Sequence, residues 1–147
     1  MHVHDLLDTL PLDRPWAHGV DTDTCTGRER QSIAMIKAQA PTVPIYLGDD
    51  SALFSLRGEP IAGLISVMAN AWPDKTKKYV ERCFANQASP LNIFEGLEQA
   101  PNPIPIKAVL SCLGLSTPDV RLPLHVEDLF SHQKIEFSIQ EMHTLFN

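Results

Sequence analysis

The sequence lacks the features that mark membrane, secreted and nucleic-acid-binding proteins. No apolar run approaches the ~20 residues that cross a bilayer, and the polar, acidic start MHVHDLLDTL does not have the form of a signal peptide. The 12 Lys and Arg are outnumbered by 18 Asp and Glu, which gives a net charge of −6 and a pI near 5.4. An acidic chain has the wrong sign for general affinity to phosphate backbones. We therefore expect a cytoplasmic protein with no nucleic-acid or membrane partner.

Cysteine is scarce, and histidine shows no clear metal-binding pattern. Cys25, Cys83 and Cys112 are odd in number and widely spaced, so neither a disulfide framework nor a zinc knuckle is indicated. We interpret them as reduced thiols, mostly buried. His2 and His4 alternate as metal ligands can, but they lie at the terminus. The remaining histidines have no ligand spacing between them: His18, His125, His132 and His143. We expect neither a metal site nor a cofactor.

The chain does contain enough apolar residues for one globular domain. Of its 147 residues, 44% are hydrophobic and 20% are charged, which is well away from the composition of disordered chains. The length fits one ordinary domain of roughly 100 to 200 residues. Aromatic residues make up 7% of the chain, and four of them are expected in the core: Trp16, Tyr46, Trp72 and Tyr79.

Apolar spacing and proline positions predict alternating helices and strands as far as residue 90. Strands are predicted at 43–47 and 62–70, and both are continuously apolar, which is typical of parallel strands buried on both faces. A short run at 17–22 is a further extended candidate. Helices are predicted at 5–12, 28–39, 51–56 and 73–87.

After residue 90 the strand signals stop. Helical spacing is found at 91–99, 104–114 and 135–146, separated by proline-containing segments. We therefore divide the chain into an α/β part at 1–90 and a helical region at 91–147.

The most informative local feature is Gly48-Asp49-Asp50, which directly follows the predicted strand at 43–47. Ligands bind at the carboxyl ends of parallel strands, so a glycine that permits close approach and two carboxylates favour a site there. The alternative is that Asp49 or Asp50 caps the helix that follows. The second predicted strand ends in small polar groups at 66–70, in the same layer.

Other polar groups are interpreted as ordinary surface residues. A nucleophilic site needs a base and an orienting acid near the nucleophile, and no G-x-S-x-G motif is present. One basic group is read as the solvated face of the helix at 73–87: Lys75, Lys77, Lys78 and Arg82.

Several ordered strings resemble one enzyme family. They are VPIYLGDDSALFSLRGEPIAGLISVMANAWP and PNPIPIKAVLSCLGLSTPDVRLPL, and the matched motifs extend over about 19–124. They resemble the LSGDD, GVISVTANVAP, EPNPIPVK and LRLPL patterns in the C-terminal half of dihydrodipicolinate synthase, also called 4-hydroxy-tetrahydrodipicolinate synthase. A related pyruvate aldolase such as N-acetylneuraminate lyase is the alternative ancestor, but the GDD and NPIP strings favour the former.

The resemblance implies a (β/α)₈ barrel with a C-terminal helical domain, usually assembled as an oligomer. This chain would then form a partial TIM barrel, its last three β/α units, followed by a small C-terminal α-helical region. The implied chemistry is that of a class I aldolase, a lyase of lysine biosynthesis: a lysine forms a Schiff base with pyruvate, and the enamine attacks aspartate semialdehyde. Only the neutral amine attacks a carbonyl, so that lysine needs a lowered pKa.

When the sequence is matched to the family's patterns, the Schiff-base lysine of the family corresponds to Asp23. The family string K-E-A-[ST]-G corresponds to DTCTG at 23–27, and Asp23 stands 25 positions before Gly48, the spacing expected without a gap. An aspartate cannot form an imine. No other lysine is expected to replace it, because Lys37 lies mid-helix and Lys107 falls on the lysine of the NPIPVK pattern.

The resemblance leaves only part of the family's pocket in this chain, which has about half the family's length. The G-T-T-G-E loop, the Y-Y-N tyrosine and the arginine after the fifth strand all precede its first residue. The residual pocket consists of Ile65, whose counterpart contacts pyruvate, and Gly48 with Asp49 and Asp50. We do not expect this remnant alone to bind pyruvate. Three strands do not close a barrel of eight, so open sheet edges are expected.

These observations lead to three functional hypotheses. One is an enzyme that is active only when a complementary N-terminal half-barrel chain completes it, as in a split barrel. Another is a non-catalytic interaction or regulatory subunit that assembles as a homo-oligomer through the family's surfaces. The hypothesis that we favour is a truncated, degenerate family member, a pseudoenzyme that does not catalyse the reaction alone.

Overall fold

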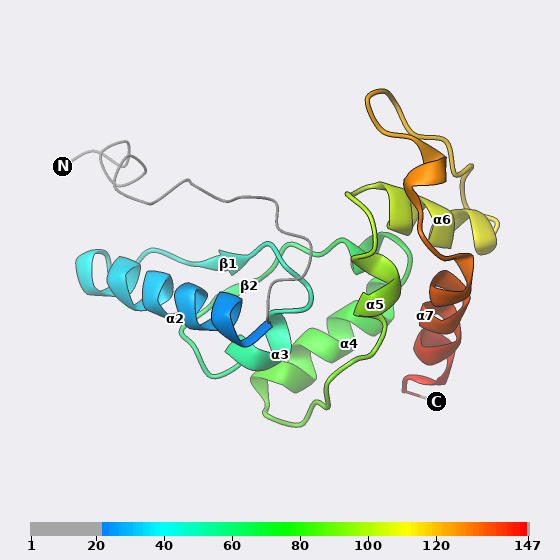
Figure 1. Cartoon of the computed structure of the whole chain (residues 1–147). Helices are drawn as coiled ribbons and strands as arrows, with labels where there is room; N and C mark the ends of the chain where they lie inside the picture. Colours follow the sequence, from blue (N-terminus) through cyan, green and yellow to red (C-terminus); the bar gives the residue numbers. More distant parts are fainter. Residues whose placement is uncertain (1–21, 147) are drawn as a thin grey trace.

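The computed structural model describes the backbone of residues 22–146 and the side chains of residues 27–146 (Figure 1). The predicted helix at 5–12 and the extended run at 17–21 lie outside this range. So do several side chains considered above: His2, His4, Trp16, His18 and Cys25.

The described chain contains a sheet of two short parallel strands. β1 (Tyr46–Leu47) pairs with β2 (Gly63–Leu64). The prediction of neighbouring parallel strands is confirmed, and the strands fall within the predicted runs at 43–47 and 62–70. The ladder is much shorter than those runs, although hydrogen bonds extend the pairing by one residue at each end.

The second strand ends early because a side chain takes its backbone donors. The N–H groups of Val67 and Met68 donate to Oδ2 of Asp50, at 2.8 and 2.9 Å. These N–H groups are therefore not available to a neighbouring strand, and the chain enters a 3₁₀ turn, η1 (Met68–Asn70). The prediction of a strand that continues to residue 70 is wrong for this reason.

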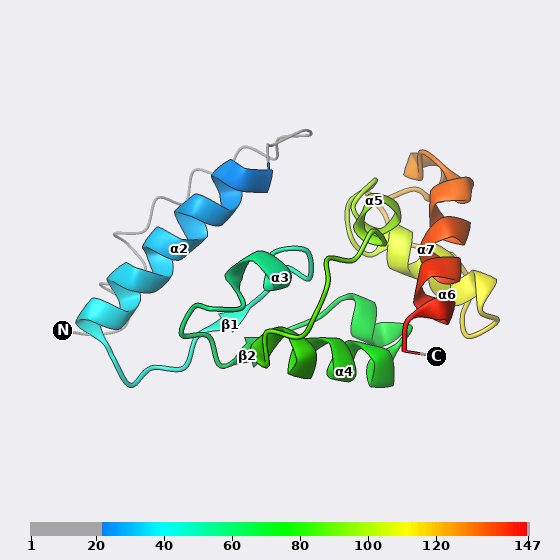
Figure 2. The ribbon, with the colours of Figure 1, turned by 90° about the horizontal axis from the view of Figure 1, so that it is seen from below.

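The helix α2 (Thr22–Gln39) begins earlier than the helix predicted at 28–39. Thr and Asp residues in its first turn are favourable at a helix N-terminus, where backbone N–H groups have no intrahelical partner. The short helix α3 (Leu53–Leu56) confirms the helical turn predicted at 51–56. The two helices lie side by side in Figures 1 and 2, and Arg30 of α2 donates to the carbonyl of Ser55 at 2.6 Å.

The helix α4 (Pro73–Phe84) confirms the helix predicted at 73–87, apart from the last residues. Pro73 occupies the first turn, where its missing N–H has no effect on helical bonding. The buried face of α4 carries Thr76, Tyr79 and Cys83. Figure 2 shows the short helix α3 between α2 and α4, and it contacts both.

Beyond α4 the described chain is helical with irregular connections. α5 (Phe94–Leu97), α6 (Ile104–Cys112) and α7 (His132–Thr144) confirm the three predicted helices, and all three are shorter than predicted or shifted at their ends. The 3₁₀ turn η2 (Val126–Asp128) was not predicted. These elements gather at the end of the molecule away from α2 (Figure 1).

A glycine and a buried serine allow α5 and α7 to approach closely. A Cβ on Gly96 would lie 2.3 Å from Oγ of Ser138 and 2.5 Å from the carbonyl oxygen of Lys134. The hydroxyl of Ser138, which is fully buried, donates to the carbonyl of Ile93 at 2.7 Å. The contact therefore depends on the absence of a side chain at residue 96.

The structure corrects several burial predictions. Trp72 and Tyr79 are buried, as predicted, but Tyr46 is 56% exposed because its side chain leaves β1 on a face that the described residues do not cover. Cys83 is a buried free thiol, whereas Cys112 is exposed and the prediction of burial is wrong for it.

The prediction of a solvated basic face on α4 is wrong for Lys75. Its ammonium group donates to three carbonyls at the end of α7: Met142 at 2.5 Å, His143 at 3.1 Å and Leu145 at 2.8 Å. A cation is favourable there because the last carbonyls of a helix have no intrahelical partner. The other members of the basic group are exposed, as predicted: Lys77, Lys78 and Arg82.

Candidate functional site

Asp50 is a buried carboxyl group that connects the carboxyl ends of the two strands. Only 8% of the residue is exposed, and Oδ2 accepts both N–H groups that begin η1. Within the described part of the chain, Oδ1 has no hydrogen bond of normal geometry. Burial raises the pKa of Asp50 above its ordinary value, while hydrogen bonds from Ser66, Met68 and Val67 oppose the rise. The fold therefore holds this carboxyl group through hydrogen bonds from the segment that follows β2.

Asp49 stabilises the turn that follows β1. Its Oδ1 accepts from the backbone N–H of Ser51 at 2.9 Å and from the Ser51 hydroxyl at 2.8 Å. The N-cap of α3 is Ala52, which makes no side-chain cap hydrogen bond. The alternative that Asp49 or Asp50 caps α3 is therefore wrong, although both carboxylates do bind backbone N–H groups nearby.

Gly48 and Ile65 lie next to each other at the carboxyl end of the sheet, since Ile65 N donates to Leu47 O at 2.8 Å. A Cβ on Gly48 would meet no other described atom within 4 Å, so packing inside the described chain does not explain a glycine there. Ile65 is 69% exposed. The structure thus brings together the predicted residues Gly48, Asp49 and Ile65, and leaves Ile65 open to solvent.

Glu98 reaches this site from the helical region, and no sequence pattern predicts it there. Partial burial raises the pKa of Glu98, the charges of Asp49 and Asp50 raise it further, and a hydrogen bond with the Ser51 side chain opposes the rise. Glu98 follows α5 and is far from Ser51 in the sequence. No motif links the two segments, so only the tertiary fold shows that the strand end carries a third carboxyl group.

The other small polar groups after β2 serve the local backbone. Oγ of Ser66 accepts from the N–H of Ala69 at 3.1 Å, and the side-chain amide of Asn70 donates to the carbonyl of Val67 at 2.9 Å. These contacts stabilise η1, and the Ser66 side chain also hydrogen-bonds Asp50.

Asp23 is the second residue of α2, and its side chain lies outside the described residues. Lys37 is near the end of the same helix, where its ammonium group donates to the carbonyls of Pro41 at 3.2 Å and Val43 at 2.7 Å. Lys107 lies within α6. Lys37 is thus hydrogen-bonded at the start of the strand, away from the carboxylates at its end.

The arrangement supplies carboxyl groups and a hydroxyl at one strand end. Raised pKa values allow Asp50 and Glu98 to hold a proton more readily than free carboxyl groups do. Among residues 27–146, no group of three or more His, Cys, Asp and Glu side chains is arranged to hold a metal ion. In the same range, no helix combines the length and apolar character needed to cross a membrane.

Comparison with known proteins gives a consistent result. The profile of the Dihydrodipicolinate synthetase family matches residues 20–142. The 4-hydroxy-tetrahydrodipicolinate synthase of Wolbachia pipientis wMel is 38% identical over 109 residues, which cover 71% of this chain and 37% of that protein. The synthase of the same name from Francisella philomiragia is 36% identical over 106 residues, covering 67% of this chain and 36% of that protein. The chain thus spans little more than a third of the length of these relatives.

Solved structures agree on the fold. A monomeric dihydrodipicolinate synthase variant superposes with a TM-score of 0.65 at 23% identity, over 82% of this chain and 43% of the other. A chloride-inhibited dihydrodipicolinate synthase from Acinetobacter baumannii, complexed with pyruvate, superposes with a TM-score of 0.60 at 25% identity, over 76% of this chain and 41% of the other. The described residues therefore have the same arrangement as part of a synthase. The chain belongs to the Dihydrodipicolinate synthetase family.

Proposed function

We propose that this chain is a cytoplasmic protein derived from a dihydrodipicolinate synthase, and that it does not catalyse the Schiff-base aldol reaction by itself. In this proposal residues 1–90 form the last three β/α units of a TIM barrel, and residues 91–147 form the helical region that follows them. The family match and the pair of neighbouring parallel strands, each followed by a helix, support it. The ancestral reaction joins pyruvate to aspartate semialdehyde.

The observation that carries this proposal is the residue at position 23. Family chemistry begins with attack of a neutral lysine amine on the carbonyl of pyruvate, and a carboxylate cannot replace an amine in that step. Two of the chain's lysines are also hydrogen-bonded as ammonium donors to carbonyl groups, Lys37 beside β1 and Lys75 at the end of α7. Neither points to the carboxylates that follow β1.

Borohydride trapping tests the proposal directly. The chain is incubated with pyruvate, reduced with borohydride and measured by intact mass, with a full-length synthase from one of the relatives as the positive control. We expect an adduct on the synthase and none on this chain. A pyruvate adduct on the chain, mapped to a lysine by peptide mass, would overturn the proposal.

The Asp23→Lys variant distinguishes two causes of inactivity, the absent lysine and an incomplete pocket. If position 23 still lies in a formed pocket, the variant gains a trapped adduct. If the pocket requires the N-terminal half of a barrel, the variant gains one only when that half, taken from a full-length relative, is added as a second chain. A wild-type chain that becomes active on such addition would favour the split-barrel hypothesis instead.

A second candidate function is that of a non-catalytic interaction subunit. The exposed apolar side chains of Tyr46 and Ile65, on neighbouring strands of the sheet, favour it. Size-exclusion chromatography with light scattering tests this candidate. A monodisperse oligomer is expected of an interaction subunit, whereas polydisperse aggregates would contradict it and support a degenerate remnant.

A further inference from the structure

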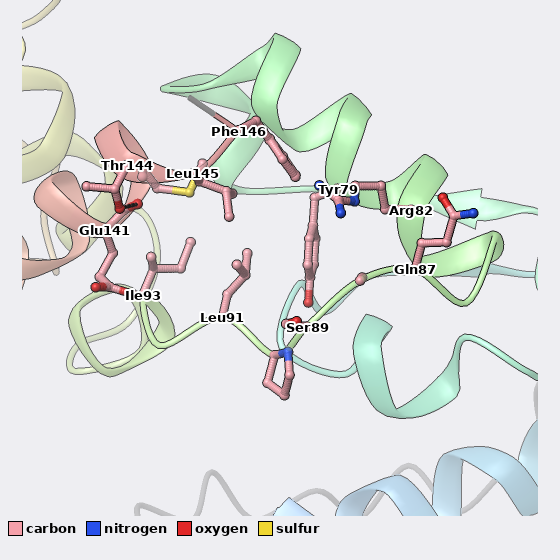
Figure 3. A pocket seen from close by; sticks show the side chains of 13 residues that line it. Tyr79, Arg82, Gln87, Ser89, Leu91, Ile93, Glu141, Thr144, Leu145 and Phe146 are labelled. Carbon is pink, nitrogen blue, oxygen red and sulfur yellow. Dashed lines mark hydrogen bonds between the residues drawn. The ribbon is translucent and has the colours of Figure 1, made fainter.

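A cavity of about 260 Å³ lies at the junction of α4, the connector after it and the end of α7. Figure 3 shows side chains from these three segments around it. Its walls are formed by the ring of Tyr79 and by the apolar side chains of Leu91, Ile93 and Leu145. None of these residues belongs to the group of carboxylates at the strand ends, so the cavity is separate from the site described above.

One end of the cavity carries Arg82, which forms no ion pair with another residue of the described range. The ion pairs within residues 27–146 join Arg30 to Glu59 and Lys134 to Glu95, so Arg82 makes no direct ion pair in this range. Its guanidinium carbon lies 5.1 Å from the ring centre of Phe146, which restricts the side chain at the cavity.

The other polar groups of the lining define which ligands fit. The side-chain amide of Gln87 lies on the same side as Arg82 and offers a further donor (Figure 3). Glu141 lies at the opposite side of the lining. A negative charge is therefore favourable near Arg82 and unfavourable near Glu141, and an apolar group is favourable between them.

We propose that this cavity binds a small monocarboxylate with an apolar tail. The carboxylate pairs with the guanidinium of Arg82, which presents N–H donors in a geometry that matches two carboxylate oxygens. The tail lies among Leu91, Ile93 and Leu145, where it displaces water from apolar surface. This binding does not depend on the proposed loss of aldolase activity, and it uses none of the residues that the trapping experiment probes.

The test uses phenylacetate as the probe and the full 147-residue chain, with binding measured by calorimetry and by backbone NMR shifts. We expect saturable binding with shifts at residues 87–93 and 141–146. Arg82→Gln should weaken it about tenfold, because a charge-assisted hydrogen bond is lost. Lys78→Gln, which removes an exposed cation of the same helix outside the cavity, should leave the affinity unchanged.

Three further results decide the outcome. Phenylacetamide, a neutral analogue, should bind about tenfold more weakly than phenylacetate, and Leu91→Trp, which fills the cavity, should abolish binding. Binding of the amide as tight as that of the acid would overturn the proposal. So would equal weakening by Arg82→Gln and Lys78→Gln, or the absence of saturable binding by phenylacetate.

Discussion

Asp50 follows a strand end, where sequence reasoning expects a ligand-binding group, yet its contacts are with the backbone. Its Oδ2 holds the first N–H groups of η1, and this hydrogen bonding crosses from the end of β1 to the end of β2. The last residue of the GDD string thus has a structural role, because it links the ends of two parallel strands by hydrogen bonds. A carboxylate suits this role because it accepts two N–H bonds on one oxygen.

Replacing Asp50 should reveal this structural role. Asp50→Ala leaves the partly buried N–H of Val67 and the buried N–H of Met68 without an acceptor, and we expect the free energy of unfolding to fall by about 1–3 kcal/mol. Asp50→Asn keeps an acceptor oxygen and should lose less. Urea denaturation of the three proteins measures the difference. Equal losses in the two variants would show that the carboxyl oxygen is not needed by η1.

The pH dependence of stability follows from the same group. Burial raises the pKa of Asp50 in the folded chain above its ordinary value of 3.8. Between these two pKa values the folded state binds more protons than the unfolded state, so the free energy of unfolding falls as the pH rises through this window. The unfolding free energy of the wild type minus that of Asp50→Asn is measured from pH 3 to pH 8. We expect this difference to decrease as the pH rises. A difference that does not change with pH would contradict the raised pKa.

At the scale of helices and strands, Lys75 is the residue that connects two elements. Lys75 lies in the first turn of α4, and its ammonium group donates to the last carbonyls of α7. Lys75→Met removes these hydrogen bonds, and we expect a loss of about 1–2 kcal/mol together with faster amide exchange in the last turn of α7. Lys77→Met, an exposed position of the same helix, is the matched control and should have little effect. Similar exchange in both variants would argue against the cap.

Replacing two helical glycines with alanine should change the free energy of unfolding in opposite directions. Gly96→Ala places a Cβ 2.3 Å from the hydroxyl oxygen of Ser138, so α5 and α7 must move apart, at a cost of about 1–3 kcal/mol. Gly27→Ala in α2 meets no described atom within 4 Å and should gain about 0.5–1 kcal/mol, since alanine loses less backbone entropy in a helix. Thermal unfolding measures both. A stabilised Gly96→Ala variant would contradict the close helix contact.

Sequence patterns predicted the helices better than the strands. Local signals, such as Pro73 at the start of α4 and the periodic apolar residues of α6 and α7, are enough to place those helices. The extent of β2 depends on a hydrogen bond that Val67 N–H donates to the side chain of Asp50, 17 positions earlier, and no local sequence pattern contains this contact. Lys75 and Glu98 were missed for the same reason, because each acts on a segment distant in the sequence.

For the whole molecule, the main feature is a sheet too small to be stable by itself. Two short strands are marginal in water unless other elements cover them, and within the described residues Tyr46 and Ile65 remain exposed beside them. The sequence motifs identified the family because they record its strand ends and helical region. Local motifs carry no information on what packs against Tyr46 and Ile65, because such contacts are tertiary.

Self-association through the sheet should depend on Ile65. Ile65→Gln removes an apolar side chain that is 69% exposed, and we expect a lower average mass in light scattering than for the wild type at the same concentration. Leu122→Gln is the control, because Leu122 is 80% exposed in the helical region, away from the sheet. If only the control lowers the mass, self-association uses the helical region instead.

The lysine cap on α7 also has a consequence for the order in which the protein forms during synthesis. The carbonyls that Lys75 binds lie 67 to 70 positions after it in the sequence. The helix α4 therefore leaves the ribosome with its ammonium group unpartnered, and the cap closes only after Leu145 has been made. The contact that fastens the helical region to α4 is thus among the last to form, and a nascent chain interrupted before α7 lacks it altogether.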